Sequence, residues 1–233
     1  MLAVVGTALT HFILMLTKND LTIKNASDVF DEIENTGVQH IGFKDIGLPM
    51  DELEVLVQKM KKQGMKTYLE VVSESEAANL RSVKNALQLG VDNLIGGTYV
   101  EQTLRLLKEV KTGPKYYPYI GKIIGHPCLL RGTIDEIAAD GKKKEALGID
   151  GINLLAYRYD GDIEKLIISV LRSVKVPLIV AGSIDSFERV HRMIQLKVDG
   201  FTIGGAVLDK KFVANGSLSD QVKAVLKKTG EIH

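Results

Sequence analysis

Residues Pro177–Asp209 have the sequence PLIVAGSIDSFERVHRMIQLKVDGFTIGGAVLD. Two short apolar segments, Leu178–Ala181 and Phe201–Ile203, flank a helical pattern at Ser186–Leu196, and each is followed by glycine. Apolar runs without alternation are typical of parallel strands that are buried on both faces. Glycine at the end of such a strand lets another group approach the backbone closely. The stretch therefore predicts two β/α units of a parallel sheet, with a site where their strands end.

The glycines after these two segments are candidate phosphate ligands. Gly182 and Ser183 follow the first strand, and Gly204 and Gly205 follow the second. Backbone N–H groups in neighbouring glycine-rich loops can bind phosphate, and a short helix after Gly205 would add its positive end. The same residues could instead form tight turns without a ligand.

The rest of the chain repeats this alternation of apolar and helical segments. We predict the eight strands at Phe12–Thr17, His40–Gly47, Lys66–Val72, Asp92–Gly97, Lys115–Gly121, Gly151–Tyr157, Leu178–Ala181 and Phe201–Ile203. We predict the helices at Ser27–Glu34, Asp51–Gln63, Ser75–Gln88, Glu101–Val110, Ile134–Leu147, Ile163–Val174, Ser186–Leu196 and Leu218–Lys228. Such alternation implies a parallel sheet. Eight units without a shift in composition favour an α/β fold of one domain over residues 1–233, a closed (β/α)8 TIM barrel with eight parallel strands.

The eight units and the glycine-rich ends of the last two resemble the phosphate-binding (β/α)8 barrels of the ribulose-phosphate-binding type. These include the histidine- and tryptophan-pathway barrel isomerases, the sugar-phosphate epimerases and thiamine phosphate synthase. The resemblance implies that a phosphorylated metabolite binds at Gly182, Ser183, Gly204 and Gly205.

Two departures from this group limit which reaction the resemblance implies. The fifth strand, KYYPYIG, has no acid, whereas the histidine- and tryptophan-pathway isomerases use an aspartate there. The sixth strand lacks the Schiff-base lysine of related aldolases. A lysine on the second strand beside a carboxylate is nearer to the epimerase and decarboxylase members.

Length and composition bound the class of protein. The 233 residues suit one barrel, whose usual size is about 250 residues. The net charge of +1 provides no basic field for nucleic acid or for an anionic membrane. Cys128 is the only cysteine, which excludes an internal disulfide and fits a reducing cytoplasm.

The apolar N-terminus could suggest a signal peptide. It has no basic residue before its apolar run, and His11 interrupts that run. Residues Phe12–Thr17 are also needed as the first barrel strand. We therefore expect Met1–Thr10 to cover the barrel floor rather than to direct export, and we expect a cytoplasmic protein.

Lys44 and Glu70 are candidate catalytic residues because each interrupts an apolar strand. Buried charges are costly unless they are paired or functional. The two residues occupy equivalent levels of adjacent strands, so we expect them to meet, and such a pair could move a proton next to a carbonyl group. Lys44 could also act as an electrophile or form a Schiff base, or the pair could be purely structural. Asp20 is a candidate second acid or base, or a simple turn residue.

Further candidates for substrate binding are Asn93 and Asn153 within strands, and His126 and Arg131 on the long connection at Lys122–Gly132. That connection is also a candidate lid. Cys128 on the same connection has no base near it in sequence, which makes it a poor candidate nucleophile.

The leading hypothesis is isomerisation or epimerisation of a phosphorylated, sugar-derived metabolite by proton transfer. The alternatives are a carbon–carbon lyase, namely an aldolase or decarboxylase, and a non-catalytic sensor of a phosphorylated metabolite. We predict no cofactor and no metal site, because no spacing of His, Asp and Glu resembles a ligand set. We predict no nucleic-acid or membrane partner and consider a homodimer, the commonest oligomer.

Overall fold

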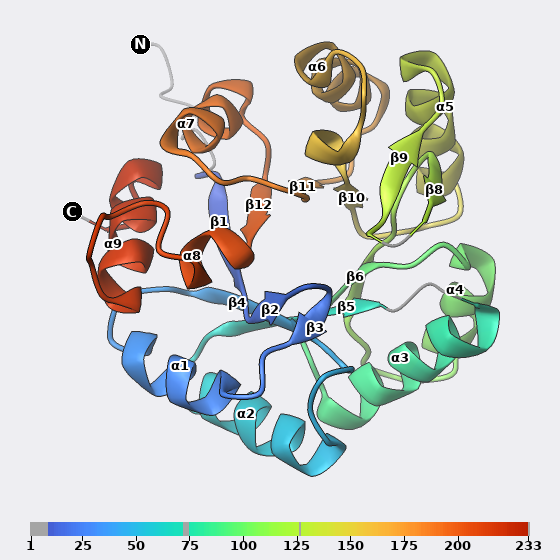
Figure 1. Ribbon diagram of the computed structural model, residues 1–233. Helices are drawn as coiled ribbons and strands as arrows, with labels where there is room; N and C mark the ends of the chain where they lie inside the picture. Colours follow the sequence, from blue (N-terminus) through green and yellow to red (C-terminus); the bar gives the residue numbers. More distant parts are fainter. Residues whose placement is uncertain (1–8, 72–74, 126, 233) are drawn as a thin grey trace, which may run out of the picture.

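Eight parallel strands form a barrel in the computed structural model, which describes residues 9–71, 75–125 and 127–232. The strands are β1 (His11–Met15), β4 (His40–Lys44), β5 (Lys66–Val71), β6 (Asn93–Gly96), β7 (Lys115–Tyr117), β10 (Ile152–Leu154), β11 (Leu178–Val180) and β12 (Gly200–Ile203). Their order around the barrel is β10-β11-β12-β1-β4-β5-β6-β7. The barrel closes between β7 and β10, where the Asn153 N–H donates to the Pro118 carbonyl at 2.9 Å. The predicted fold is confirmed (Figure 1).

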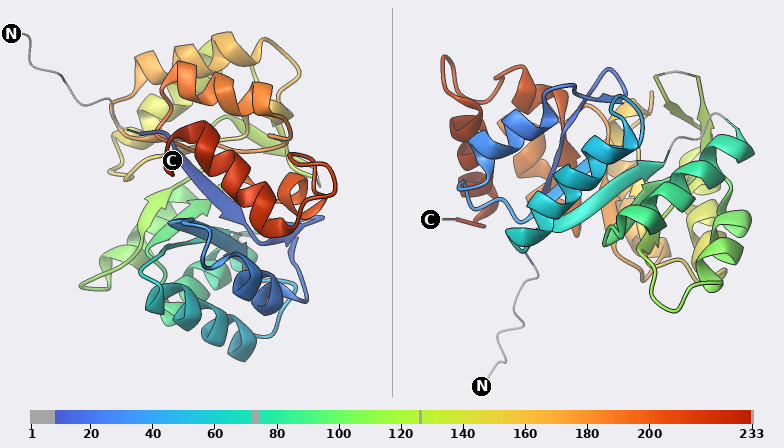
Figure 2. Two further views of the ribbon diagram at one scale, coloured as in Figure 1. Left: turned by 90° about the vertical axis from the view of Figure 1, so that its left-hand side faces the viewer. Right: turned by 90° about the horizontal axis from the view of Figure 1, so that it is seen from below.

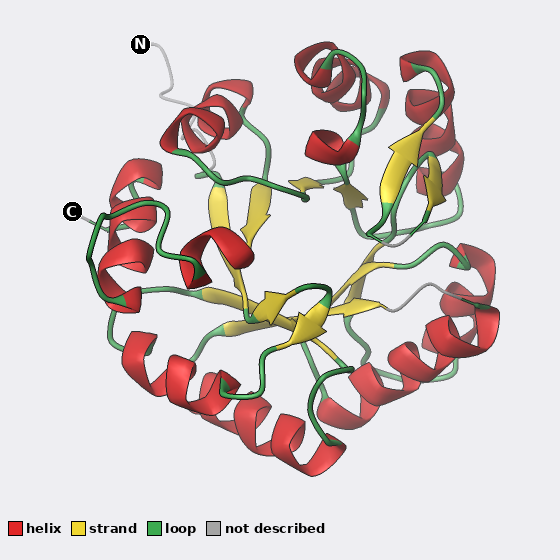
Figure 3. Ribbon diagram, in the orientation of Figure 1, coloured by secondary structure: helices red, strands yellow, loops and turns green. Residues whose placement is uncertain are grey.

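Helices between the strands form the outer layer, as Figure 3 shows. They are α1 (Ala26–Ile33), α2 (Met50–Lys62), α3 (Glu76–Leu89), α4 (Val100–Lys108), α5 (Ile134–Glu145), α6 (Ile163–Ser173), α7 (Phe187–Leu196) and α9 (Leu218–Thr229). Two short elements lie at the carboxyl ends of strands, the 3₁₀ helix η1 (Ala156–Arg158) and the helix α8 (Gly205–Leu208). No helix of the described residues is long and apolar enough to span a membrane.

Two apolar cores result from the alternation of side chains along each strand. In β1, Phe12 and Leu14 pack outwards with the helices, whereas Ile13 and Met15 point into the barrel. The interior cluster consists of Ile13, Met15, Tyr68, Ile95, Tyr117 and Ile179. These apolar side chains lie between the two open ends of the barrel, at which its cavities are found.

The helix boundaries agree with the predicted ranges to within two residues. Ser75 caps α3, since its side chain accepts a hydrogen bond from the Ala78 N–H, and Gly90 ends that helix with a φ of 62°. The helix α2 begins at Met50, after Pro49 and one residue before the predicted start at Asp51. Asp51 lies in the first turn, where a negative charge still favours the helix.

Two antiparallel hairpins at the carboxyl end of the barrel were not predicted. The strands β2 (Thr17–Lys18) and β3 (Leu21–Thr22) pair after β1, and β8 (Lys122–Ile124) pairs with β9 (Leu129–Arg131) after β7. The first barrel strand therefore ends at Met15, two residues earlier than expected, and Asp20 lies in a hairpin turn. Most of the N-terminal segment Met1–Thr10, which we expected to cover the barrel floor, lies outside the described residues.

Candidate functional site

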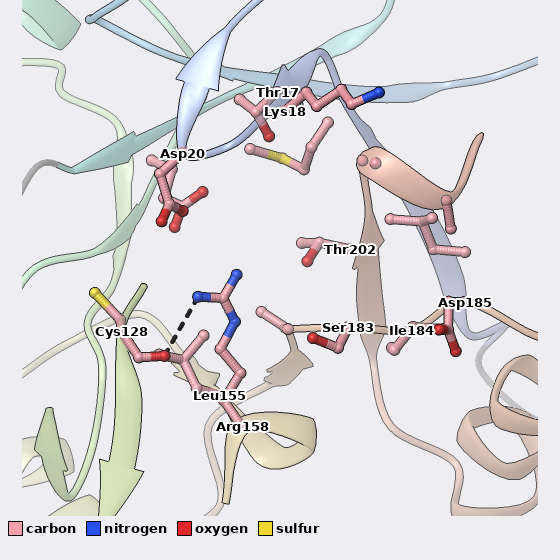
Figure 4. A pocket seen from close by; sticks show the side chains of 18 of the residues that line it. Thr17, Lys18, Asp20, Cys128, Leu155, Arg158, Ser183, Ile184, Asp185 and Thr202 are labelled. Atoms are coloured by element: carbon pink, nitrogen blue, oxygen red, sulfur yellow. Dashed lines mark hydrogen bonds between the residues drawn. The ribbon is translucent and has the colours of Figure 1, made fainter. Parts of the chain in front are cut away.

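A cavity of about 310 Å³ opens at the carboxyl ends of the strands. Its walls come from the β2–β3 hairpin, from β5 and from the loops that follow β7, β10, β11 and β12. The catalytic candidates Asp20 and Glu70 line it together with the candidate phosphate ligands Gly182, Ser183, Gly204 and Gly205. Figure 4 views this cavity, which lies where active sites of (β/α)8 barrels are found.

The loop after β11 has an unusual backbone conformation at two successive residues. Gly182 has a φ of 87° and Ser183 has a φ of 53°. A positive φ at a residue other than glycine is uncommon and is often found at functional sites. A side chain at position 182 would also meet Cγ of Arg158 at 2.9 Å. Glycine is therefore required at position 182 for its backbone angle and for the close approach of Arg158.

The loop after β12 passes directly into α8. Within the described residues, the N–H groups of Gly205 and Ala206 donate no hydrogen bond, because the bonds of this turn begin with the Val207 N–H. A Cβ built on Gly205 would meet no atom within 4 Å, so this backbone borders open space. The expected short helix after Gly205 is present, and its first turn offers free donors beside the cavity.

Arg158 is a residue of this cavity that the sequence analysis missed. Figure 4 shows its guanidinium group projecting into the cavity between Asp20 on one side and Ser183 and Thr202 on the other. Its Nη1 donates to the carbonyl of Cys128 at 3.3 Å, and it forms no ion pair with another described residue. The signal was an arginine directly after the apolar sixth strand, the position at which a barrel side chain faces its active site.

Other charges on the cavity wall are already compensated. Lys18 forms an ion pair with Asp209, and Lys211 lies 3.4 Å from Asp185. Asp185 is also bonded by Arg189 at 2.9 Å. Arg158 therefore differs from these residues in having a positive charge without a carboxylate partner in the part of the chain described.

Lys44 and Glu70 meet as expected. Lys44 Nζ lies 3.6 Å from Glu70 Oε1 and 3.3 Å from Asp20 Oδ1. Tyr119 donates from its hydroxyl to the same Glu70 oxygen at 2.5 Å. Asp20 and Glu70 line the cavity, whereas the buried ammonium of Lys44 holds these two carboxylates from behind.

The carboxylates of this cluster favour the protonated forms of Lys44 and Tyr119. Burial opposes the charge on Lys44, but Glu70 and Asp20 more than offset it and raise its pKa above the usual range. Burial and the Glu70 carboxylate raise the pKa of Tyr119 well above its usual value, so its hydroxyl remains a donor. A protonated lysine is suited to stabilise carboxylates or a developing negative charge, whereas a Schiff-base amine must lose its proton.

The other residues predicted to bind substrate do not line this cavity within the described part of the chain. Asn93 borders a different cavity, at the amino ends of the strands. Arg131 faces away from the site on β9 and pairs with Asp160 at 3.2 Å. Asn153 is buried inside the barrel, and neither atom of its amide has a partner in the part of the chain described. His126 lies outside the described residues.

Cys128, which the sequence analysis judged a poor candidate nucleophile, borders the cavity. Burial is the main cause of its raised pKa, to which Asp20 and Glu70 also contribute. A thiol of this kind is a weak nucleophile at neutral pH.

Fold and site together define a (β/α)8 barrel with a charged cavity at the carboxyl ends of its strands. Among solved structures, it is similar to thiamine phosphate pyrophosphorylase from Pyrococcus furiosus, with a TM-score of 0.64, 16% identity and 97% of each chain covered. It is also similar to phosphoribosylanthranilate isomerase from Thermotoga maritima, with a TM-score of 0.64 and 10% identity over 96% of this chain and 100% of that one. A third such structure is tryptophan synthase from M. tuberculosis, with a TM-score of 0.63 and 13% identity over 96% and 93% of the two chains.

At these identities the likeness establishes the fold. The tryptophan-pathway isomerase and the thiamine phosphate enzyme belong to groups that the sequence resembles, so the resemblance is confirmed at this level. No protein-family model and no curated protein matches the sequence.

Proposed function

We propose that the cavity binds a small phosphorylated, sugar-derived metabolite. The observation that carries this proposal is the combination, in one cavity, of unpaired backbone donors at Gly205 and Ala206 with the unpaired guanidinium of Arg158. Backbone N–H groups and arginine are the donors that phosphate prefers. A volume of about 310 Å³ lies at the lower end of the range for small-molecule sites, about 300–1,000 Å³, which favours a small ligand.

The proposed reaction is isomerisation or epimerisation through an enediolate. With the phosphate at the β11 and β12 loops, the carbon chain of the ligand would extend towards Asp20 and Glu70. Glu70 Oε1 is engaged by Tyr119 and Lys44, which leaves Oε2 to accept a proton from the carbon next to a carbonyl. Glu70 then returns this proton to the neighbouring carbon in an isomerisation, or Asp20 in its protonated form delivers one to the opposite face of the same carbon in an epimerisation.

In this proposal Lys44 has a narrower role than the sequence suggested. It touches the two carboxylates rather than lining the cavity, so its role is to position them. Its raised pKa disfavours a Schiff base, and with it the aldolase alternative.

Deuterium exchange tests the reaction directly. Ketose and aldose phosphates are incubated with the protein in D2O, and NMR follows the hydrogen on the carbon next to the carbonyl. We expect exchange with at least one of these compounds, and loss of exchange in Glu70→Gln with phosphate-ester binding retained. Release of a shorter carbonyl compound would indicate a lyase, and binding without exchange would indicate a sensor.

Location and partners complete the proposal. The single cysteine supports a cytoplasmic location, and the net charge of +1 gives no support to a nucleic-acid partner. A homodimer is proposed from the general frequency of such oligomers, and light scattering measures it.

A further inference from the structure

Three side chains of types that can bind a metal meet at the opposite, amino end of the barrel. His11 begins β1, His40 begins the adjacent strand β4, and Glu231 follows α9, which packs beside β1 (Figure 2). One candidate ligand atom from each of the three lies within 4.8 Å of the others. The two imidazole rings have centroids 4.5 Å apart. Because these residues are far apart in sequence, their spacing along the chain gave no metal-binding signal.

Glu231 is held in place by one of its oxygens only. Its Oε1 accepts from the Phe12 N–H at 2.9 Å and from the Thr229 hydroxyl at 2.8 Å. Its Oε2 lies 3.8 Å from His11 Nδ1, which is beyond hydrogen-bond distance. The side chain is only 7% exposed, and a carboxylate buried to this extent needs a compensating charge. A cation between Oε2 and the imidazoles would supply it, as would a proton on His11, which lies 3.8 Å away.

His40 is oriented in the same manner. Its Nδ1 lies 2.9 Å from the hydroxyl of Tyr68, a residue of the barrel interior. Histidines that bind metals generally use one ring nitrogen for the metal and the other for a hydrogen bond that fixes the ring. This leaves Nε2 of His40 available as a ligand.

We propose that His11, His40 and Glu231 bind a zinc ion, with water as the fourth ligand. Two histidines and one glutamate form a known zinc ligand set, and an open fourth position accepts water. A cavity of about 700 Å³ that His11 and His40 border can supply that water. Tetrahedral ligands at roughly 2.0–2.1 Å from zinc lie about 3.4 Å apart, so the ligand atoms, now within 4.8 Å of one another, approach by up to about 1.4 Å through side-chain rotation. The ion would join the segment after α9 to β1 and β4.

Calorimetry on the untagged, chelator-dialysed full chain tests the proposal, with ZnCl2 as the titrant. We expect one zinc ion per chain. At 100-fold free zinc over Kd, we expect the Tm to rise by roughly 5–10 °C. Visible absorption after addition of Co2+ should indicate four-coordinate geometry.

Three variants each remove one ligand: His11→Gln, His40→Gln and Glu231→Gln. Each should weaken zinc binding by at least about 100-fold, and Tyr68→Phe, which frees the His40 ring, by about 10–100-fold. His191→Gln changes an exposed histidine on α7 and should bind zinc as the parent does. Thermal unfolding without zinc checks that each variant folds, and Glu231→Gln keeps both acceptor contacts of Oε1. Absence of stoichiometric binding, or equal affinity in Glu231→Gln and His191→Gln, would overturn the proposal.

Discussion

The buried ammonium of Lys44 forms ion pairs with two carboxylates that line the carboxyl-end cavity, those of Asp20 and Glu70. We expect Lys44→Met to lower the free energy of unfolding by about 2–4 kcal/mol, because two partly buried carboxylates, Asp20 and Glu70, lose a positive charge that both face. Lys44→Met/Glu70→Leu should recover part of the loss. Urea denaturation measures these differences.

Lys84→Met provides the matched control for Lys44→Met, since Lys84 is exposed on α3. It should change the free energy of unfolding by less than about 0.5 kcal/mol. Binding of inorganic phosphate should survive in both variants. A Lys44→Met protein as stable as the control would contradict the ion-pair account.

Asn153 presents the opposite case, a buried polar side chain whose amide lacks a partner in the described part of the chain. An unsatisfied polar group in an apolar interior costs about 1–3 kcal/mol. We therefore expect Asn153→Leu to raise the free energy of unfolding by about 1 kcal/mol, after allowance for the larger side chain. Chemical denaturation checks this value.

Asn79→Leu is the matched comparison, because Asn79 is fully buried but bonded. Its amide donates to the Thr103 hydroxyl at 2.9 Å and accepts from the Thr98 N–H at 3.3 Å. This variant should be destabilised. If Asn153→Leu instead weakened phosphate-ester binding, Asn153 would reach the ligand, as the sequence suggested.

The first turn of α8 is suited to bind phosphate because it combines free N–H donors with open space at Gly205. Gly205→Asp places a carboxylate beside the proposed phosphate and should abolish binding of inorganic phosphate while the protein still folds. Gly205→Ala adds a methyl group without charge and should retain binding within about tenfold. Calorimetry distinguishes them, and equal affinities in both variants would place the phosphate elsewhere.

The elements also explain why some site residues could be predicted and others could not. Strand positions follow a local pattern, so Lys44 and Glu70 were placed on adjacent strands, and their 3.6 Å contact follows from parallel register. Arg158 was not predicted as a site residue, because its side chain reaches the cavity through η1, which turns it over Gly182. That contact depends on the loop conformation. Asn93 was misplaced because its position at the start of β6 brings it to the amino end.

For the whole molecule, the two ends of the barrel are separated by its packed interior. Sites without shared contacts are generally independent. We expect dialysis against a strong chelator to lower the Tm through loss of zinc while inorganic phosphate binds with unchanged affinity. Thermal unfolding and calorimetry on the same sample measure both effects. Loss of phosphate binding that zinc restores would indicate that the ends are coupled.

The contacts that form when the barrel closes could not be predicted for individual residues from the sequence. The repeat of eight units predicted the architecture, since each unit buries one strand against its neighbours. The meeting of His11, His40 and Glu231 depends instead on how the last helix returns to the first strand. No local pattern encodes such a contact.

The bond between the Phe12 N–H and Glu231 has a consequence for the connectivity of the chain. Because the last helix returns to the first strand, the order of the units along the polypeptide can be changed without changing their places in space. A circular permutant that joins Ile232 to Leu9 through a short glycine linker, and opens between Thr112 and Gly113, should fold cooperatively and bind inorganic phosphate. Circular dichroism and calorimetry measure this, and an unfolded permutant would contradict it. The position of the chain termini would then be shown not to determine the fold of the barrel.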